Sequence, residues 1–345
     1  MKNLDIKGTT GYSTIRIGEY LENLERYIPA KKAVIITDHN VSNFYKKDFP
    51  SYEIIELGTG EGIKTLETIH EIYGKLVAME ADRSSYIVGI GGGIVCDIAG
   101  FAASTYMRGI GFGFVSTTLL SQVDASVGGK NGVNFGGYKN MVGVFNQPEF
   151  VICDLNLLKT LPQREILCGM GEIVKHGAIA DIDLFAFLED NYEKALELDP
   201  DVIERLVYDS VVIKSGIVNK DERESGERKK LNFGHTFGHA IEKTTKVKHG
   251  EAVSLGMVVA SKLSVKKGSL SNEESERLEE LLRKLKLPTK PDFDTDMVLN
   301  AMKKDKKRKG DSIDFVLLNG LGNAVIETIS FQELENAVME LGLRG

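Results

Sequence analysis

The first half of the chain alternates short apolar runs with stretches in which apolar residues recur at helical spacing. Residues 32–38 and 51–57 are rich in β-branched side chains, which predicts buried strands. Residues 64–80 carry their apolar side chains close to a period of 3.6, which predicts an amphipathic helix. A third apolar run, 86–90, leads directly into the glycines 91–93. Strand, helix, strand, glycine turn and helix in this order are typical of a parallel sheet with right-handed crossovers.

From about Leu161 the pattern becomes mainly helical. Asp199 and Pro200 combine an N-cap residue with a proline at the first helical position, which predicts a helix start. Residues 271–274 form a capping box that opens a charged amphipathic helix extending to Lys286. The sequence therefore predicts an α/β N-terminal domain with a parallel sheet, residues 1–160, followed by a mainly α-helical domain, residues 161–345.

Composition narrows the class of protein. The chain has 345 residues, and its 42% hydrophobic content is ample for buried cores in two domains. A formal net charge of −7 argues against a general nucleic-acid binder. Cys96, Cys153 and Cys168 show no CxxC spacing, which suits reduced thiols in a cytoplasm. Residues 1–5 lack the apolar segment of a signal peptide, and no apolar run is typical of a membrane span. We expect a soluble, cytoplasmic protein.

Three of the six histidines, His235, His239 and His249, lie close together in the sequence. His235 and His239 are spaced i and i+4, so a helix would present both on one face. A divalent metal needs imidazole nitrogens and often a carboxylate, for which Glu172 is the candidate because it lies among apolar and small residues. Sequence spacing does not show which two histidines bind. The alternative is a capped helix whose histidines bind no metal.

The glycine turn at 91–93 suggests a second site. Glycines expose backbone N–H groups, and the N-terminus of the following helix adds positive potential for a pyrophosphate. The turn does not match G-x-G-x-x-G, so a simple tight turn is the alternative. Thr117 and Thr118 would add hydroxyl donors at the end of the next strand, and Glu61 could accept from a ribose hydroxyl.

Basic residues in glycine-rich or apolar surroundings suggest anion binding. Lys130 follows two glycines in a polar stretch that is expected to be a loop, and Lys139 and Asn140 fall in another such loop. Lys214 follows the apolar stripe of a predicted helix, so it either extends to the surface or points into an anion-binding site. Residues 303–309 are the most basic run, interpreted as a phosphate clamp in preference to a solvated turn or a nucleic-acid patch.

Four blocks of this sequence together resemble the 3-dehydroquinate synthase family, with a likeness that extends from about Asp38 to Leu318. The blocks are GGGIVCDIAGFAASTYMRG at 91–109, TTLLSQVDASVGGK at 117–130, GEIVK at 171–175, and LNFGHTFGHA at 231–240 with His249-Gly250-Glu251. One departure is Ser116, where the family often has proline before the paired threonines.

The resemblance implies an NAD-binding N-terminal domain and a helical domain that binds metal and substrate. It implies one divalent ion, Zn²⁺ or Co²⁺, held by Glu172, His235 and His249, and leaves His239 for the substrate. The implied substrate contacts are Arg108, Asp124, Lys130, Lys139, Asn140, Lys175, Lys214, Arg228, Asn232, His239 and Lys306. The implied NAD contacts are Asp38, Asn40, Glu61, Lys64, Gly91, Gly92, Gly93, Asp97, Thr117 and Thr118, with Lys130 and Lys139 contributing.

The family's reaction converts 3-deoxy-D-arabino-heptulosonate 7-phosphate to 3-dehydroquinate and phosphate in the shikimate pathway. It oxidises an alcohol transiently with NAD, eliminates phosphate, reduces the ketone again and closes a ring by aldol addition. The resemblance also implies a homodimer. Three alternatives remain at this stage: a sugar-phosphate cyclase acting on another ketose phosphate, a metal-dependent polyol dehydrogenase, and a catalytically silent NAD- or metal-binding regulator.

Overall fold

The computed structural model describes residues 1–245, 247–290, 295–303 and 308–340. The chain divides into two compact units, Met1–Pro162 with Ile203–Arg223, and Gln163–Val202 with Glu224–Gly345. This division differs from the expected boundary after residue 160, because the first unit extends to Pro162 and also includes most of helix α6 (Pro200–Lys220). The change of pattern near Leu161 marks where the mainly helical part of the chain begins. The pattern alone does not show with which unit each helix packs.

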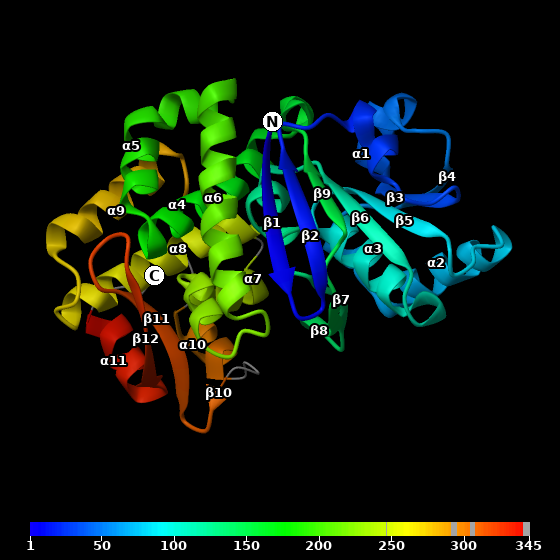
Figure 1. Ribbon diagram of the computed structural model, residues 1–345. Coiled ribbons are helices and arrows are strands. Elements are labelled where there is room, and N and C mark those ends of the chain that lie inside the picture. Colours follow the sequence, from blue (N-terminus) through cyan, green and yellow to red (C-terminus); the bar gives the residue numbers. More distant parts are fainter. Residues whose placement is uncertain (246, 291–294, 304–307, 341–345) are drawn as a thin grey trace. The chain divides into compact units, whose positions relative to one another are not determined.

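A seven-stranded sheet forms the centre of the first unit (Figure 1). Its strands, in spatial order, are β1 (Lys2–Gly8), β2 (Gly11–Ile17), β9 (Phe150–Cys153), β6 (Gly111–Ser116), β5 (Tyr86–Gly91), β3 (Ala33–Asp38) and β4 (Glu53–Leu57). Only β1 runs antiparallel to its neighbour, so the predicted parallel sheet is confirmed. The predicted strands at 32–38, 51–57 and 86–90 are β3, β4 and β5, and the predicted helix at 64–80 is α2 (Leu66–Ala78).

The register of this sheet brings several predicted residues to one edge. Ile90 pairs with Thr37, and Gly91 pairs with Ser116, so β3, β5 and β6 end at the same level. The helices α1 (His39–Tyr45) and α3 (Gly93–Thr105) begin directly after β3 and β5. Ligands of open parallel sheets bind beyond these carboxyl ends. Beneath the edge the sheet is closely packed, and every residue of β5 is buried.

The segment from residue 130 to 145 differs from the sequence prediction. It was expected to contain glycine-rich loops, but it is a hairpin of β7 (Lys130–Phe135) and β8 (Tyr138–Phe145). Gly136 and Gly137 have φ values of 58° and 79°, the left-handed pair that a tight hairpin turn requires. Cross-strand pairs such as Val133 with Val142 stabilise the hairpin, and short-range polarity does not reveal such pairing. Lys139 and Asn140 therefore lie on a strand.

The second unit is mainly helical, as predicted. Its helices are α4 (Gln163–Ala180), α5 (Ile182–Leu196), α7 (His235–Thr244), α8 (His249–Lys266), α9 (Asn272–Lys284), α10 (Thr295–Lys303) and α11 (Phe331–Glu340). A three-stranded antiparallel sheet of β10 (Arg308–Lys309), β11 (Ser312–Leu318) and β12 (Ala324–Ser330) was not predicted. The expected capping box of α9 is present, with the Ser271 hydroxyl accepting from Glu274 N and the Glu274 carboxylate accepting from Ser271 N.

Short helical turns connect these elements. They are η1 (Leu21–Tyr27), η2 (Lys46–Asp48), η3 (Glu61–Ile63), η4 (Tyr106–Arg108), η5 (Ser121–Ala125), η6 (Leu155–Thr160) and η7 (Glu227–Asn232). The predicted start of α6 is confirmed, because Asp199 Oδ1 accepts a hydrogen bond from Val202 N at 3.1 Å. Helix α9 ends at Lys284, two residues before the predicted end, and Lys286 follows with a φ of 59°. Within the described residues, no helix has the length and hydropathy needed to cross a membrane.

Candidate metal centre and cofactor site

The glycine turn between β5 and α3 leaves no room for side chains. A Cβ on Gly91 would lie 2.5 Å from Val95 Cβ, and one on Gly93 would lie 2.7 Å from Ala125 Cβ. Gly92 is the N-cap of α3, and no side chain caps this helix. The uncapped N–H groups of the first turn, together with the helix dipole, are suited to a phosphate or pyrophosphate.

Other residues predicted to bind NAD follow strands β3, β4 and β6 at the carboxyl edge of the sheet. Asp38 closes β3 and caps α1, since its Oδ1 accepts from Val41 N at 3.0 Å. Asn40 is exposed in the first turn of α1. Thr117 N donates to Gly91 O at 3.0 Å, and the Thr118 hydroxyl is 3.0 Å from Ser121 Oγ. Glu61 lies on η3, where it accepts from the Asn134 side chain at 2.7 Å.

Lys64 links the glycine-turn helix to the β7–β8 hairpin. Its side chain is buried, and its amine donates to Asp97 on α3 and to Asn140 Oδ1 at 2.6 Å on β8. Burial raises the pKa of Asp97, whereas the Lys64 charge acts in the opposite direction. The backbone of Asn140 is left-handed, with a φ of 50°, and its N–H donates to Asn134 Oδ1. A predicted cofactor residue and a predicted substrate residue are thus held together by one buried lysine.

Lys214 does not extend to solvent. Its amine donates to Asp124 Oδ1 at 2.6 Å and to the Asp124 carbonyl, and the residue is 6% exposed. The surface interpretation of this lysine is therefore wrong, and the structure joins two predicted substrate residues of the first unit.

Three further basic residues predicted to bind substrate in this unit are exposed. Lys130 begins β7 and Lys139 lies on β8. Arg108 has a φ of 70° and follows Met107 at 50°, two consecutive left-handed residues that cost of order 1–3 kcal/mol each. Such strain often accompanies a functional position, so it favours a specific role for Arg108.

In the second unit, Glu172, His235 and His249 come from three different helices. Glu172 lies in the middle of α4, His235 begins α7, and His249 begins α8. Glu172 Oε1 is 3.4 Å from His235 Nε2 and 3.2 Å from His249 Nε2. One ligand atom from each residue lies within 4.8 Å of the other two. Two imidazoles and a carboxylate are a donor set suited to a catalytic divalent metal with an open position.

Glycines allow these helices to approach closely enough. A Cβ on Gly250, next to His249, would lie 2.4 Å from Cys168 Cα on α4. A Cβ on Gly256 of α8 would lie 1.9 Å from the carbonyl oxygen of Gly234, the residue before His235. Gly234 itself has a φ of 76°, which favours glycine. The glycines of the two histidine motifs therefore have steric roles, and the close approach they allow places the donors.

Glu251, the last residue of the His249-Gly250-Glu251 motif, stabilises the start of α8. Its carboxylate accepts both 2.7 Å hydrogen bonds of a paired contact with Arg164 on α4. It also accepts from Lys248 N at 2.9 Å, which caps the helix. A planar guanidinium paired with a carboxylate is geometrically specific. Glu251 thus fixes α8 against α4 beside two of the predicted ligands, a role that the sequence analysis did not assign.

The electrostatics of the donor set favour a cation. Burial would raise the pKa of Glu172, but Lys175 and His235 hold it well below its ordinary value. Burial would lower the pKa of His249, yet Glu172 and Glu242 raise it to about 10. Burial lowers the pKa of His235, against the influence of Glu172. Glu172 is therefore ionised at neutral pH and available as an anionic ligand, which fits the binding of a divalent ion.

His239 lies one turn after His235 on α7. Its ring centroid is 5.3 Å from that of His235 and 6.4 Å from that of His249. It is absent from the groups of described residues whose ligand atoms are close enough for a metal. His239 is therefore not among the three candidate ligands, although its ring lies beside that of His235.

The remaining predicted substrate residues of this unit are mostly withdrawn from solvent. Lys175 is buried and pairs with Glu172, and Arg228 on η7 is also buried. Asn232, the last residue of η7, donates to the carboxylate of Glu224. Lys306 lies outside the described residues.

A residue missed by the sequence analysis is Glu242. Its Oε2 is 3.4 Å from His249 Nδ1, and its side chain is 8% exposed. It follows His235 by seven residues on α7, so helical spacing is the signal that could have identified it.

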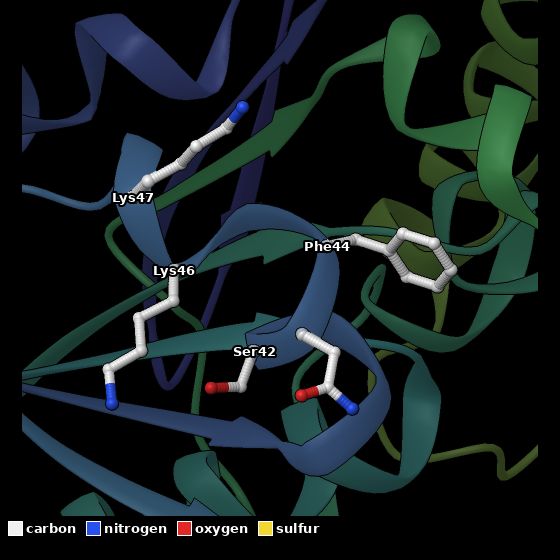
Figure 2. Close-up of a pocket in the computed structure, with 5 residues that line it drawn as sticks. Ser42, Phe44, Lys46 and Lys47 are labelled. Atoms are coloured by element: carbon white, nitrogen blue, oxygen red, sulfur yellow. The ribbon is translucent and has the colours of Figure 1, made fainter.

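A surface pocket of about 480 Å³ lies elsewhere, on α1 and η2 of the first unit. It is lined by Ser42, Asn43, Phe44, Lys46 and Lys47. Figure 2 shows the Lys46 and Lys47 side chains extending in different directions. None of the predicted site residues lines it, so it is separate from the sites described above.

Two family models match this chain in succession. Residues 54–168 match the model of the 3-dehydroquinate synthase N-terminal family, and residues 169–308 match that of the C-terminal family. A 3-dehydroquinate synthase from Dehalococcoides mccartyi is 44% identical over 314 residues, 88% of each chain.

Two solved structures are similar over nearly the whole chain. One is a 2-deoxy-scyllo-inosose synthase complexed with carbaglucose-6-phosphate, NAD⁺ and Co²⁺; it is 28% identical, has a TM-score of 0.87, and the match covers 98% of this chain and 100% of that one. The other is the 2-epi-5-epi-valiolone synthase of Streptomyces hygroscopicus with NAD⁺ and Zn²⁺, 27% identical with a TM-score of 0.88 and 98% of both chains covered. With both family models matching in succession, this chain belongs to the 3-dehydroquinate synthase family.

Proposed function

We propose that this protein converts 3-deoxy-D-arabino-heptulosonate 7-phosphate to 3-dehydroquinate and phosphate, a carbon–oxygen lyase reaction of the shikimate pathway. The observation that carries the proposal is the convergence of Glu172, His235 and His249, in a chain that is 44% identical to a 3-dehydroquinate synthase. The two similar solved structures are other cyclases, but they are only 27–28% identical, which favours the heptulosonate over their substrates.

In this proposal Glu172, His235 and His249 hold one divalent metal. When bound, such a metal polarises a substrate hydroxyl oxygen as a Lewis acid. The buried Lys175 keeps Glu172 ionised in the absence of metal, so the carboxylate does not need to lose a proton on binding. The metal is Zn²⁺ or Co²⁺, the two ions carried by the similar structures.

NAD is proposed to bind at the carboxyl edge of the parallel sheet. The bare turn Gly91–Gly93 and the start of α3 would bind its pyrophosphate, because the N–H groups there have no side-chain cap. NAD held there would supply reversible hydride transfer without being consumed. The contacts assigned to it are Asp38, Asn40, Glu61, Lys64, Asp97, Thr117, Thr118, Lys130 and Lys139.

The substrate carries a carboxylate and a phosphate, which need cationic partners. We assign these to Arg108, Lys130, Lys139, Lys175, Lys214, Arg228 and Lys306, with Asp124, Asn140 and Asn232 binding hydroxyls. His239 would orient or transfer a proton, since imidazole does so near neutral pH. We propose an NAD-binding domain, 1–160, and a metal- and substrate-binding domain, 161–345. Of the assigned residues in 161–345, Lys214 is the one that groups with the first compact unit.

The test is phosphate release from the heptulosonate phosphate in the presence of NAD, with and without a chelator. We expect stoichiometric phosphate release, loss of activity with the chelator, and no net change in nicotinamide absorbance. Accumulation of NADH would instead indicate a polyol dehydrogenase. Turnover of a ketose phosphate without a carboxylate, in preference to the heptulosonate, would indicate another cyclase. Absence of any turnover would favour a regulatory binding protein.

The family resemblance further suggests a homodimer, which sedimentation velocity would test. We also propose that the protein acts in the cytoplasm. Its three cysteines are free and buried, which suits a reducing compartment.

A further inference from the structure

The inference concerns how His249 is oriented toward the proposed metal. A neutral histidine carries its proton on one ring nitrogen, and the other nitrogen is then available to a metal. Which nitrogen is available is set by the partner of the other one, commonly a carboxylate or a carbonyl. An unfixed ring could present the wrong nitrogen, or the right one in the wrong direction.

Each nitrogen of His249 faces a different carboxylate. Nε2 lies 3.2 Å from Glu172 Oε1, within the proposed donor set, and Nδ1 lies 3.4 Å from Glu242 Oε2 on the opposite side. The second distance is at the long end of hydrogen bonding. Both contacts leave the imidazole with one preferred orientation, in which Nε2 points to the donor set.

The helix places Glu242 where this contact is made. His235 and Glu242 are seven residues apart on α7, two turns along one face, so a proposed ligand and the partner of another ligand come from the same surface. The Glu242 side chain is 8% exposed, whereas that of His249 is 28% exposed. A carboxylate withdrawn from water in this way requires polar partners, and the His249 N–H is one of them.

Glu242 is not itself part of the donor set. Among the described residues, the only group of potential ligands that contains His249 is Glu172, His235 and His249. His235 has a comparable constraint, because its Nδ1 lies 3.2 Å from the backbone carbonyl of Phe233. Nδ1 of His235 thus faces a carbonyl oxygen, and Nδ1 of His249 faces a carboxylate oxygen.

We propose that Glu242 is a positioning residue that accepts the Nδ1–H of His249, fixes its tautomer and directs Nε2 to the divalent metal. The proposal rests on the metal assignment of the proposed function. Outer partners of this type commonly contribute 10–100-fold to metal affinity.

The experiment measures metal affinity directly, without reference to turnover. The full-length protein is freed of metal and titrated with Co²⁺ against a chromophoric chelator, and the visible absorption spectrum of the Co²⁺ form is recorded. The variants are Glu242→Ala, which removes the acceptor, and Glu242→Gln, which keeps an acceptor oxygen without the charge. The matched control is Glu165→Gln, because Glu165 pairs with Lys248, the residue before His249, but is not in the donor set of described residues.

We expect Co²⁺ to bind Glu242→Ala about 10–100-fold more weakly than the unaltered protein, with a changed spectrum. Glu242→Gln should lose less affinity, and Glu165→Gln should bind normally. Circular dichroism of the metal-free variants would reveal a folding defect. If Glu242→Ala has such a defect, the visible absorption spectrum of Co²⁺-bound Glu242→Gln tests the role of Glu242 instead.

Two outcomes separate failure of this inference from failure of the metal assignment. If Glu242→Ala and Glu242→Gln bind Co²⁺ with unaltered affinity and spectrum while His249→Ala loses the metal, the role of Glu242 is refuted and the donor set stands. If His249→Ala retains full affinity, the donor set itself is wrong, and the proposal for Glu242 is overturned with it.

Discussion

Glu222 provides a test of the first unit in which the magnitude follows from the structure. Its carboxylate accepts hydrogen bonds from Thr9 N at 2.7 Å, from the Thr9 and Thr10 hydroxyls at 2.5 Å, and from Gln147 Nε2 at 3.0 Å. It thereby attaches the end of α6 to the β1–β2 turn. A Cβ on Gly8 would lie 2.1 Å from Glu222 Oε1, so the turn and the carboxylate are in close contact.

These hydrogen bonds make Glu222 a source of pH-dependent stability. Burial would raise its pKa, but the donors on Thr10, Thr9 and Gln147 lower it from 4.5 to about 2. A shift of this size corresponds to about 3 kcal/mol of stabilisation of the ionised form. Because the folded pKa is depressed, the contribution is complete above pH 4.5 and is lost as the pH falls from 4.5 toward 2.

The variant Glu222→Gln removes the charge while keeping the shape of the side chain. Urea unfolding followed by circular dichroism should show the variant about 3 kcal/mol less stable near pH 6, and the difference should fall to less than half of that near pH 3. Both the carboxylate and its donors belong to the first unit, so the transition of that unit should shift. Circular dichroism suits this chain as the probe, because without tryptophan it lacks the usual fluorescence signal of unfolding.

The matched control is Glu204→Gln on α6, the helix that ends two residues before Glu222. Glu204 contacts Lys2 of the same hairpin at 3.6 Å, but both side chains are more than one-third exposed to solvent, 35% and 43%. An exposed pair of this type contributes 1 kcal/mol or less, roughly, so the control should change little at either pH. A Glu222→Gln variant that is as stable as the unaltered protein at pH 6, or whose deficit does not depend on pH, would refute the reasoning.

Three further predictions concern the sites. Lys214→Met should lower kcat/KM by an amount equivalent to roughly 2–5 kcal/mol if this amine binds a substrate anion, and unchanged steady-state kinetics would contradict that role. His239→Ala should retain metal and NAD but turn over slowly, whereas His249→Ala should lose metal; elemental analysis showing the reverse would support the i, i+4 histidine pair as ligands. Gly250→Ala should destabilise the protein and weaken metal binding, since the added Cβ would lie 2.4 Å from Cys168 Cα; an unchanged melting temperature would argue against this close contact.

Local sequence was sufficient to predict features in which a side chain bonds to the backbone of its own segment. The capping residues Asp199 and Ser271 were identified correctly, because an N-cap bonds to N–H groups two or three residues away. The strands at 32–38, 51–57 and 86–90 and the glycine turn were also predicted, since buried strands are continuous apolar runs. The polar β7–β8 hairpin and the β10–β12 sheet were missed, because their pairing depends on partners rather than on local pattern.

The tertiary structure decided how chemically plausible residues are combined. Helical spacing would put His235 and His239 on one face, but α8 brings His249 beside Glu172 through a helix contact that no local pattern encodes. The family resemblance implies these residues as ligands, and the glycines let α4, α7 and α8 approach closely enough to bring them together. It also decided that Lys214 pairs with Asp124, and that Glu242 and Glu251 support the start of α8. The sequence alone determined which residues could carry chemistry; only folding determined which of them meet, because hydrogen bonds and metal ligands require distances of a few ångströms between segments far apart in the chain.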